Sequence, residues 1–234
     1  MAGDIGREKL AAARAAAALV RPGMRVALGT GSTADLAIRA LGERPAGGAR
    51  IVTVASSPAS EQLARDVGLA VEPLGEGDRF DLMVDGADEV SPALDLTKGG
   101  GGALFREKLL ARHSRELVIA VDRSKLVDRL GQRSPIPIEI VPFARPAVLH
   151  HLREQRIAAA PRSLPDGGPW ITANGNELLD LDLRAADIDI AKLDRSLHAL
   201  PGVVETGLFL GMAHRVFIGR SDGTAEERVA PRAA

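Results

Sequence analysis

Apolar, strand-like runs alternate with helix-like stretches through the first two-thirds of this 234-residue chain, and this order limits the folds open to it. The expected strands are residues 25–28, 50–55, 80–85 and 117–122, and the expected helices are residues 11–20, 34–41, 60–67 and 104–112. Such alternation is typical of a parallel sheet with helices on both faces. Polar residues collect just after the strands end, where open α/β sheets bind their ligands. The sequence therefore predicts an α/β, Rossmann-like domain whose functional residues follow its strands.

The order of elements changes near Gly131. The expected elements from there are a strand (136–141), a helix (146–156), a strand (157–162), a strand pair or bent strand (170–183), a helix (190–200) and a strand (203–210). This β-α-β-β-α-β order is the split βαβ pattern of ferredoxin-like α+β domains. We expect residues 1–130 plus 207–234 to form the Rossmann-like catalytic domain and residues 131–206 a smaller α+β domain. Residues 215–218 should return to the first domain's edge, and the polar segment 224–234 should fray.

Charge and composition exclude several kinds of site. The formal net charge is -1, so overall charge gives no support to a nucleic-acid partner, and any anion site must be local. The chain has no cysteine, which excludes disulfides, thiolate zinc sites and cysteine nucleophiles, and which fits a reducing compartment. The alanine-rich stretch 11–20 contains Arg14 and is too short to span a bilayer, so no membrane segment is expected. We expect no catalytic metal, because the histidines are scattered along the chain: His113, His150, His151, His198 and His214.

A glycine-rich segment joins an expected strand to an expected helix. It reads Gly29-Thr30-Gly31-Ser32-Thr33. Glycines let the backbone approach an anion, the hydroxyls are donors, and the helix start adds a positive dipole end. The segment is neither a Walker loop nor a dinucleotide fingerprint, because both spacings are broken. Two interpretations stay open at this point, a phosphate-binding loop and a tight turn with a helix cap.

Acidic residues follow the strand expected at 80–85. The segment reads Asp85-Gly86-Ala87-Asp88-Glu89, with three carboxylates within five residues. A solvated acidic turn is a common alternative. The position at the carboxyl end of a parallel strand favours a functional role instead.

A run of four glycines follows Lys98 and precedes the helix that carries Glu107. Such a run is entropically costly and could be a flexible linker, but its place between a lysine and a helix suits a backbone cradle for oxygen atoms. Glu107 taken alone is more simply an exposed helix residue paired with a basic neighbour. Lys125, after the strand ending in Asp122, could give a point charge to a phosphate, although a surface lysine is the simpler interpretation.

Taken in order, these clusters resemble ribose-5-phosphate isomerase of the A type over nearly the whole chain. The matching stretches are residues 29–33, 85–89, 98–101, 106–108, 122 with 124–125, 137 with 139 and 141–142, 172 with 174–176, 201–204 and 207–209. Each motif is weak alone, and the ordered set is specific. The small departures are Gly102, Phe105 and Arg123, none at a position with an implied catalytic role.

The resemblance implies an aldose–ketose isomerase that interconverts ribose 5-phosphate and ribulose 5-phosphate without a cofactor. Glu107 would shuttle a proton between two carbons, and Lys98 would stabilise the charge of an enediolate. Asp85 and Asp88 would bind sugar hydroxyls, and Asp85 would assist ring opening or hydroxyl proton transfer. Further substrate contacts would come from Lys9, Ser32, Thr33 and Lys125 at the phosphate, and from Thr30, Gly31, Gly86, Ala87, Gly99, Gly100 and Gly101 lining the pocket.

Other functions stay open on the sequence. A sugar-phosphate-sensing module without catalysis would have this fold, although no fused DNA-binding segment is visible. An aminosugar-phosphate deaminase or an acyl-CoA transferase is a further possibility that rests on fold analogy. The family resemblance also implies a cytoplasmic homodimer that uses the smaller domain as its interface.

Overall fold

The computed structural model describes residues 2–43, 51–186 and 188–231, and the chain divides into two compact units. The first unit contains Met1–Ala87, Arg106–Lys125 and Gly211–Ala234, and the second contains Asp88–Phe105 and Leu126–Leu210. Residues 88–105, 126–130 and 207–210, expected in the Rossmann-like domain, group with the second unit.

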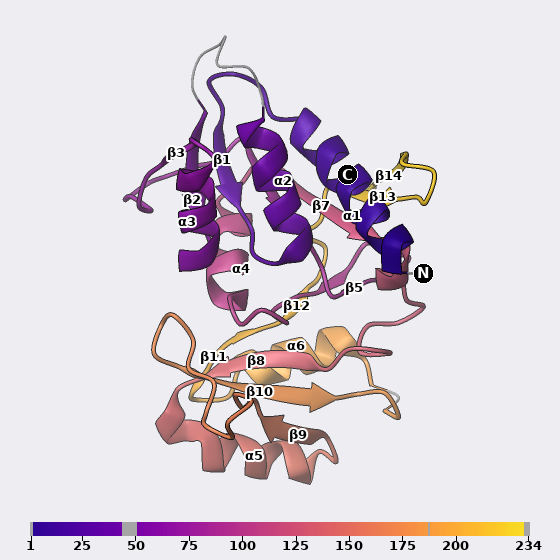
Figure 1. Ribbon diagram of the computed structural model, residues 1–234. Coiled ribbons are helices and arrows are strands. Elements are labelled where there is room, and N and C mark those ends of the chain that lie inside the picture. Colours follow the sequence, from indigo (N-terminus) through magenta and orange to yellow (C-terminus); the bar gives the residue numbers. More distant parts are fainter. Residues whose placement is uncertain (1, 44–50, 187, 232–234) are drawn as a thin grey trace. The chain divides into compact units, whose positions relative to one another are not determined.

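A seven-stranded sheet forms the centre of the first unit (Figure 1). In spatial order its strands are β14 (Ala225–Val229), β13 (Arg215–Gly219), β7 (Leu117–Asp122), β4 (Leu82–Asp85), β1 (Arg25–Leu28), β2 (Val52–Ala55) and β3 (Ala70–Val71). All neighbours are parallel except β13 and β14. The chain order reverses between β1 and β4, which makes their carboxyl ends the topological switch point of the sheet. The predicted Rossmann-like α/β fold is confirmed.

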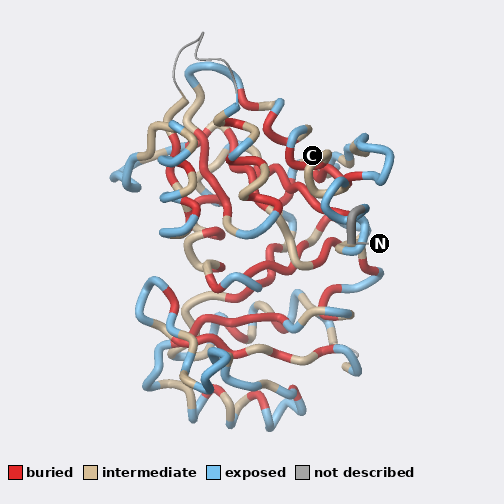
Figure 2. Tube along the Cα trace, viewed as in Figure 1, coloured by how far each residue is buried: buried red, intermediate tan, exposed pale blue. Residues whose placement is uncertain are grey.

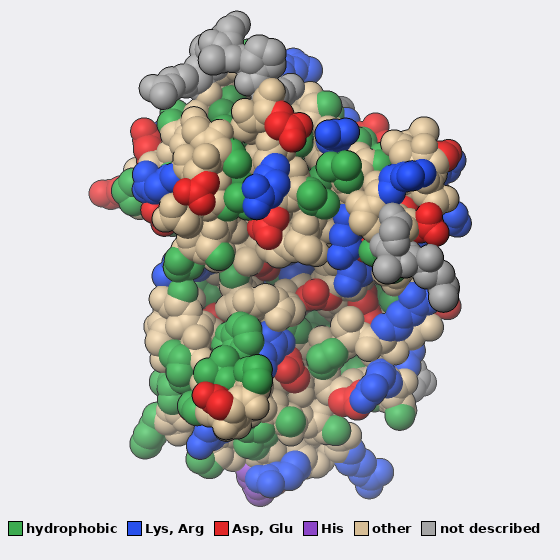
Figure 3. All heavy atoms as spheres, viewed as in Figure 1, with side chains coloured by type: hydrophobic (Ala, Val, Ile, Leu, Met, Phe, Trp, Pro, Cys, Tyr) green, Lys and Arg blue, Asp and Glu red, His purple; other side chains and the backbone are tan. Residues whose placement is uncertain are grey.

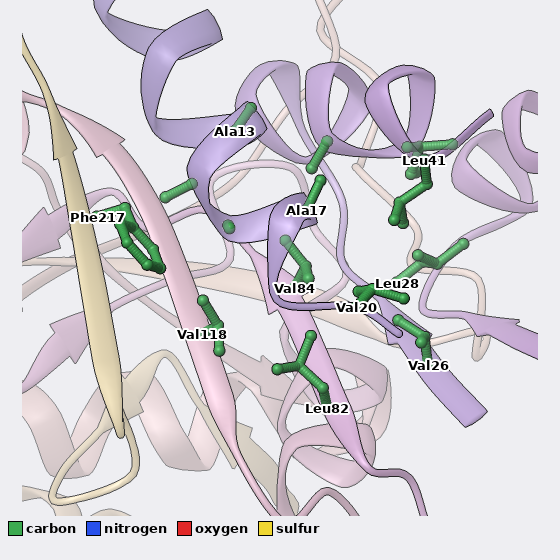
Figure 4. Packing of buried hydrophobic residues seen from close by; sticks show 14 of the residues in the cluster. Ala13, Ala17, Val20, Val26, Leu28, Leu41, Leu82, Val84, Val118 and Phe217 are labelled. Carbon is green, nitrogen blue, oxygen red and sulfur yellow. The ribbon is translucent and has the colours of Figure 1, made fainter. Parts of the chain in front are cut away.

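Helix α1 (Ala2–Ala18) packs on this sheet and against α2 (Ser32–Gly42). Its core face is made of alanines at helical spacing, with Ala13 and Ala17 buried near Val84, Val118 and the ring of Phe217 (Figure 4). Small side chains allow α1 to lie close to the strands. The first unit also contains α3 (Pro58–Asp66) and the 3₁₀ turn η1 (Arg123–Lys125). Helix α4 (Leu104–Arg112) begins in the second unit and continues in the first.

The second unit contains the predicted ferredoxin-like arrangement. Its antiparallel sheet has the order β11 (Val203–Thr206), β8 (Ile136–Ile140), β10 (Glu177–Asp182) and β9 (Ala158–Pro161). Strand β8 is buried throughout (Figure 2), and α5 (Arg145–Glu154) and α6 (Ile190–His198) contribute to the core on the face of Ile136, Ile138 and Ile140. The 3₁₀ turn η2 (Pro142–Ala144) precedes α5.

A small sheet explains why residues 88–105 belong to the second unit. Strands β5 (Glu89–Val90) and β6 (Leu96–Thr97) pair with each other, and β6 also pairs with β12 (Leu208–Phe209). The strand expected at 203–210 is therefore two strands in different sheets.

The C-terminal segment corrects one prediction. Residues 225–229, expected to fray, form β14 and pair with β13 over five registered positions. Residue 50 of an expected strand and residues 232–234 of the segment expected to fray lie outside the described residues.

On the face of the molecule drawn in Figure 3, acidic and basic side chains of the first unit are interspersed. Within residues 2–43, 51–186 and 188–231, every helix is too short or too polar to cross a membrane.

Candidate active site

The loop after β1 meets the end of β4 at the switch point of the first unit's sheet. Gly29 N–H donates to the carbonyl oxygen of Val84 at 2.9 Å, and Thr30 N–H donates to Asp85 Oδ1 at 3.2 Å. A Cβ on Gly29 would lie 1.9 Å from Cγ of Asp85, so only glycine leaves room for this carboxylate. Asp85 is fully buried and also accepts from Gly86 N–H at 2.7 Å. The predicted sugar-binding aspartate thus lies beside the predicted phosphate loop.

The start of α2 has the features of an anion site. Gly31 precedes the helix with a φ of 111°, a conformation that favours glycine, and Ser32 and Thr33 are the first helical residues. The first N–H groups of a helix have no partner within it and carry the positive end of its dipole. Burial raises the pKa of Asp35 in the same turn, and the charge of Arg39 opposes this shift.

A cluster of hydroxyl groups holds the glycine-rich loop after β1. Thr30 Oγ1 lies 2.7 Å from Ser56 Oγ and 3.3 Å from Ser60 Oγ, and Ser60 Oγ donates to the carbonyl oxygen of Gly29 at 2.7 Å. Ser56 and Ser60 are buried and are not among the residues predicted from the sequence. The serine that directly follows β2 is the signal that would have marked this position.

Lys9 reaches the same loop from α1, with Nζ 3.0 Å from Ser32 Oγ. Glu8, which precedes Lys9, holds this part of α1 in place because its carboxylate accepts from Arg123 N–H at 3.2 Å. A Cβ on Gly219 would lie 1.8 Å from the backbone oxygen of Glu8, so α1 lies directly on the end of β13. These contacts place the Lys9 ammonium at the glycine-rich loop. Two residues after Arg123, Lys125 ends η1 and is half-buried.

Glu107 lies in the first turn of α4 and is only 2% exposed. The interpretation of Glu107 as an exposed surface residue is therefore wrong. Its neighbour Lys108 is also buried, at 3% exposed. Burying ionisable side chains is costly, and such groups are concentrated at functional sites.

In the second unit, the glycine run is a hydrogen-bonded turn and not an extended linker. Gly102 N–H donates to the carbonyl oxygen of Gly99 at 2.9 Å. Gly100 N–H donates to Asp88 Oδ2 at 2.8 Å, and a Cβ on Gly100 would lie 2.7 Å from Asp88 Oδ1. Gly100 and Gly101 are exposed. The turn therefore presents backbone groups to solvent beside the Asp88 carboxylate, as a cradle for oxygen atoms would.

Lys98 precedes this turn and is 3% exposed. Its N–H donates to the carbonyl oxygen of Gly207 at 2.9 Å, and its Nζ lies 5.6 Å from the ring centroid of Phe209. An ammonium at this distance from an aromatic face is stabilised by the ring quadrupole. The fold thus holds a cation at the start of the glycine run.

Glu89, the third carboxylate of the acidic segment, has a structural role, because its oxygens bind backbone N–H groups. It is 1% exposed, and its two oxygens accept from the N–H groups of Gly131, Arg133 and Ser134 at 2.6, 2.6 and 2.8 Å. Glu89 thereby ties β5 to the segment that leads into β8.

No three His, Asp or Glu side chains within the described ranges, residues 2–43, 51–186 and 188–231, are grouped as a metal site would require.

Comparison with known proteins gives a consistent family. A family model described as ribose 5-phosphate isomerase A (phosphoriboisomerase A) matches residues 52–223. The ribose-5-phosphate isomerase A of Deinococcus radiodurans is 47% identical over 225 residues, which cover 95% of this chain and 98% of the relative.

Solved structures agree. Ribose 5-phosphate isomerase A from Methanocaldococcus jannaschii has a TM-score of 0.88 and 36% identity, over 94% of this chain and 97% of that one. A D-ribose-5-phosphate isomerase in complex with phospho-erythronic acid has a TM-score of 0.89 and 35% identity, with the same coverage. Since the family model spans well over half of the sequence and the curated relative matches nearly end to end, the chain belongs to the ribose 5-phosphate isomerase A family.

Proposed function

We propose that this chain interconverts D-ribose 5-phosphate and D-ribulose 5-phosphate through an enediolate, with Glu107 as the group that moves the proton. The observation that carries the proposal is a set of buried charged residues at the family's motifs. Asp85, Lys98 and Glu107 are 0%, 3% and 2% exposed. A fold keeps ionisable groups out of water at a cost in stability, so their presence at these motifs indicates chemistry.

The reaction needs a base, a cation near the enediolate, and a group that assists proton transfer between the C1 and C2 oxygens. Glu107 takes the proton from C2 of the aldose and returns it to C1, while a second proton passes from the C2 oxygen to the C1 oxygen. Asp85 assists that second transfer or the preceding ring opening. Lys98 stabilises the charge that develops on the enediolate oxygens, as fixed donors and cations do in other proton abstractions. General acid–base catalysis of this kind contributes about 10²–10⁴-fold.

The phosphate holds the substrate for this chemistry. We assign it to the start of α2, where Ser32 and Thr33 offer donors, with Lys9 and Lys125 as cations. The contact between Lys9 and Ser32 supports this assignment for Lys9. Asp88 and the amides of the glycine run hold sugar oxygens. Binding energy from the phosphate keeps the reacting carbons in place at the base.

The decisive experiment replaces Glu107 with Gln. Glu107→Gln should lower kcat by about 10²–10⁴-fold, because the base is removed while the shape of the side chain is kept. Isothermal titration should show that ribose 5-phosphate still binds. Glu116→Gln is the matched control, since Glu116 is a partly exposed carboxylate of the same unit that pairs with Arg215. Near-normal turnover in Glu107→Gln would sink the mechanism.

The other functions make different predictions in one assay series. A sensing module would bind ribose 5-phosphate without converting it. A deaminase would act on glucosamine 6-phosphate, and a transferase would act on an acyl-CoA. We expect conversion of ribose 5-phosphate alone.

We also propose that the enzyme is a cytoplasmic homodimer with residues 131–206 as its interface. The absence of cysteine and a role in central carbohydrate metabolism support the compartment. The exposed ring of Phe143, in the η2 turn of the second unit, supports the interface.

A further inference from the structure

One arginine outside the predicted residues contacts the glycine turn directly. Arg162 follows β9, and its Nη1 donates to the carbonyl oxygens of Gly99 at 2.9 Å and Gly100 at 3.1 Å. Its Nε donates to Asp180 Oδ2 at 2.9 Å, and its Nη2 donates to the other oxygen of the same carboxylate. The side chain is 12% exposed, and Asp180 is 23% exposed. Arg162 therefore links the glycine turn to strand β10 through a two-point ion pair.

A second contact restricts the same guanidinium. Its Cζ lies 5.9 Å from the ring centroid of Trp170. The Trp170 ring also reaches the turn, since a Cβ on Gly102 would lie 2.7 Å from Nε1. Arginine held by a bidentate carboxylate and an aromatic face has few conformations left, and the carbonyl oxygens that it binds are fixed with it.

Fixing the two carbonyl groups also fixes the direction of two amides. In a trans peptide the N–H points opposite to the preceding C=O, and the described residues contain no cis peptide. Because the Gly99 carbonyl accepts from Arg162, the N–H of Gly100 must point away from the guanidinium. This N–H donates to Asp88 Oδ2. With the Gly100 carbonyl on Arg162, the N–H of Gly101 is turned the same way, in an exposed part of the turn.

The geometry points to Arg162 as a positioning residue for the isomerisation: it aims the Gly101 amide at a substrate oxygen and the Gly100 amide at the Asp88 carboxylate, and it polarises both. This inference rests on the proposed function. A cation on the carbonyl side of a peptide strengthens the donor on its N–H side, because hydrogen bonds in a chain polarise one another. The benefit is largest when the bound oxygen carries charge, so Arg162 should matter more for the enediolate than for the substrate.

The test compares Arg162→Met with a matched arginine of the same unit. Arg145 lies at the start of α5, and its guanidinium binds the Glu177 carboxylate at 3.1 Å. Arg162→Met should lower kcat by about 10- to 100-fold and change KM by less than about threefold, whereas Arg145→Met should keep both values near wild type. Affinity for phospho-erythronic acid, whose carboxylate carries charge as the enediolate does, should fall in parallel with kcat/KM.

Two milder variants separate charge from geometry. Arg162→Lys keeps a cation but has no fork for two carbonyls and a carboxylate, so its kcat should lie between those of Arg162→Met and wild type. Asp180→Asn keeps the contact with the turn and weakens only its anchor, so its loss should be smaller than that of Arg162→Met.

Several results would overturn the inference. One is a kcat/KM of Arg162→Met within about twofold of Arg145→Met. If circular dichroism shows that Arg162→Met does not fold, Arg162→Lys becomes the deciding variant. In that case, a wild-type kcat together with a wild-type affinity for the analogue in Arg162→Lys would overturn the inference. Wild-type protein that does not convert ribose 5-phosphate would sink the proposed function, and analogue affinity in Arg162→Met would still decide the role of Arg162.

Discussion

A methyl group at Gly29 would collide with the carboxylate of Asp85, because its Cβ would lie 1.9 Å from Cγ. Gly29→Ala must therefore displace the aspartate or open the loop after β1. A shift of about 1 Å in a reacting group can cost about 10²-fold in rate, so we expect kcat/KM to fall by about that factor. Steady-state kinetics with ribose 5-phosphate will measure it.

Gly6→Ala is the control for this substitution. Gly6 lies in α1, and nothing lies within 4 Å of a Cβ built on it. That variant should keep its activity and gain up to about 1 kcal/mol in free energy of unfolding from better helix propensity. Wild-type kinetics in Gly29→Ala would show that the position of Asp85 is not critical.

Residues within motifs could be predicted from the sequence, and residues that act through the fold could not. The segments of Gly29 and Asp85 stand out because glycines and charges follow expected strands, and Lys98 stands out because four glycines follow it. Ser60 and Arg162 lie in ordinary helix and strand contexts, about 30 and 60 residues from their partners in the loops. Only the folded chain brings them together, so no spacing in the sequence marks them.

At the scale of elements, Glu89 fastens β5 to the segment 131–134 through three backbone N–H groups. Glu89→Gln replaces one acceptor oxygen with an amide that faces donors, so at least one N–H group loses its partner in a buried place. We expect the free energy of unfolding in urea to fall by about 2–4 kcal/mol, from hydrogen bonds to a charged group.

Glu61→Gln tests whether the loss of any carboxylate would lower the free energy of unfolding by the same amount. Glu61 is half exposed and pairs with Arg65 one helical turn away, a contact that contributes about 0.3–0.5 kcal/mol. An equal loss of stability in the two variants would contradict the structural role of Glu89.

Most of the longer strands and helices were predicted within a few residues, although α1 begins at Ala2, nine residues before the start expected at residue 11. The short or polar strands were not predicted. Strands β5, β6 and β12 have two residues each, too few to show any alternation. Strand β14 reads Ala-Glu-Glu-Arg-Val, which is polar because it lies at the sheet edge. Its pairing with β13 is supported by the ion pair of Arg215 with Glu227, which depends on residues in both strands.

At the scale of the whole molecule, the chain divides its charged motif residues between two compact units. Asp85 and Glu107 belong to the first unit, and Asp88 and Lys98 belong to the second. The chain passes from one unit to the other after residues 87, 105, 125 and 210. The sequence pattern indicated the two architectures but not the membership of residues 88–105, because that membership depends on pairing with β12 far along the chain.

Phe143 gives the proposed homodimer a specific test. Its side chain is 95% exposed, and Val141 beside it is 42% exposed. An aromatic side chain standing in water gains about 1.5–3 kcal/mol when it is buried, and aromatic residues dominate the binding energy of many interfaces. We expect wild-type protein to have twice the 24.5 kDa chain mass by light scattering. Phe143→Ser should raise the dimer dissociation constant by about 30- to 1000-fold.

Leu74→Ser is the matched control, since Leu74 is an exposed apolar residue of the first unit, outside the proposed interface, at 42% exposure. It should leave the dissociation constant unchanged. A monomeric wild type at micromolar concentration would refute the dimer. A dimer that tolerates Phe143→Ser but dissociates on Leu74→Ser would move the interface to the first unit, because the more exposed of the two apolar side chains would then have remained in water.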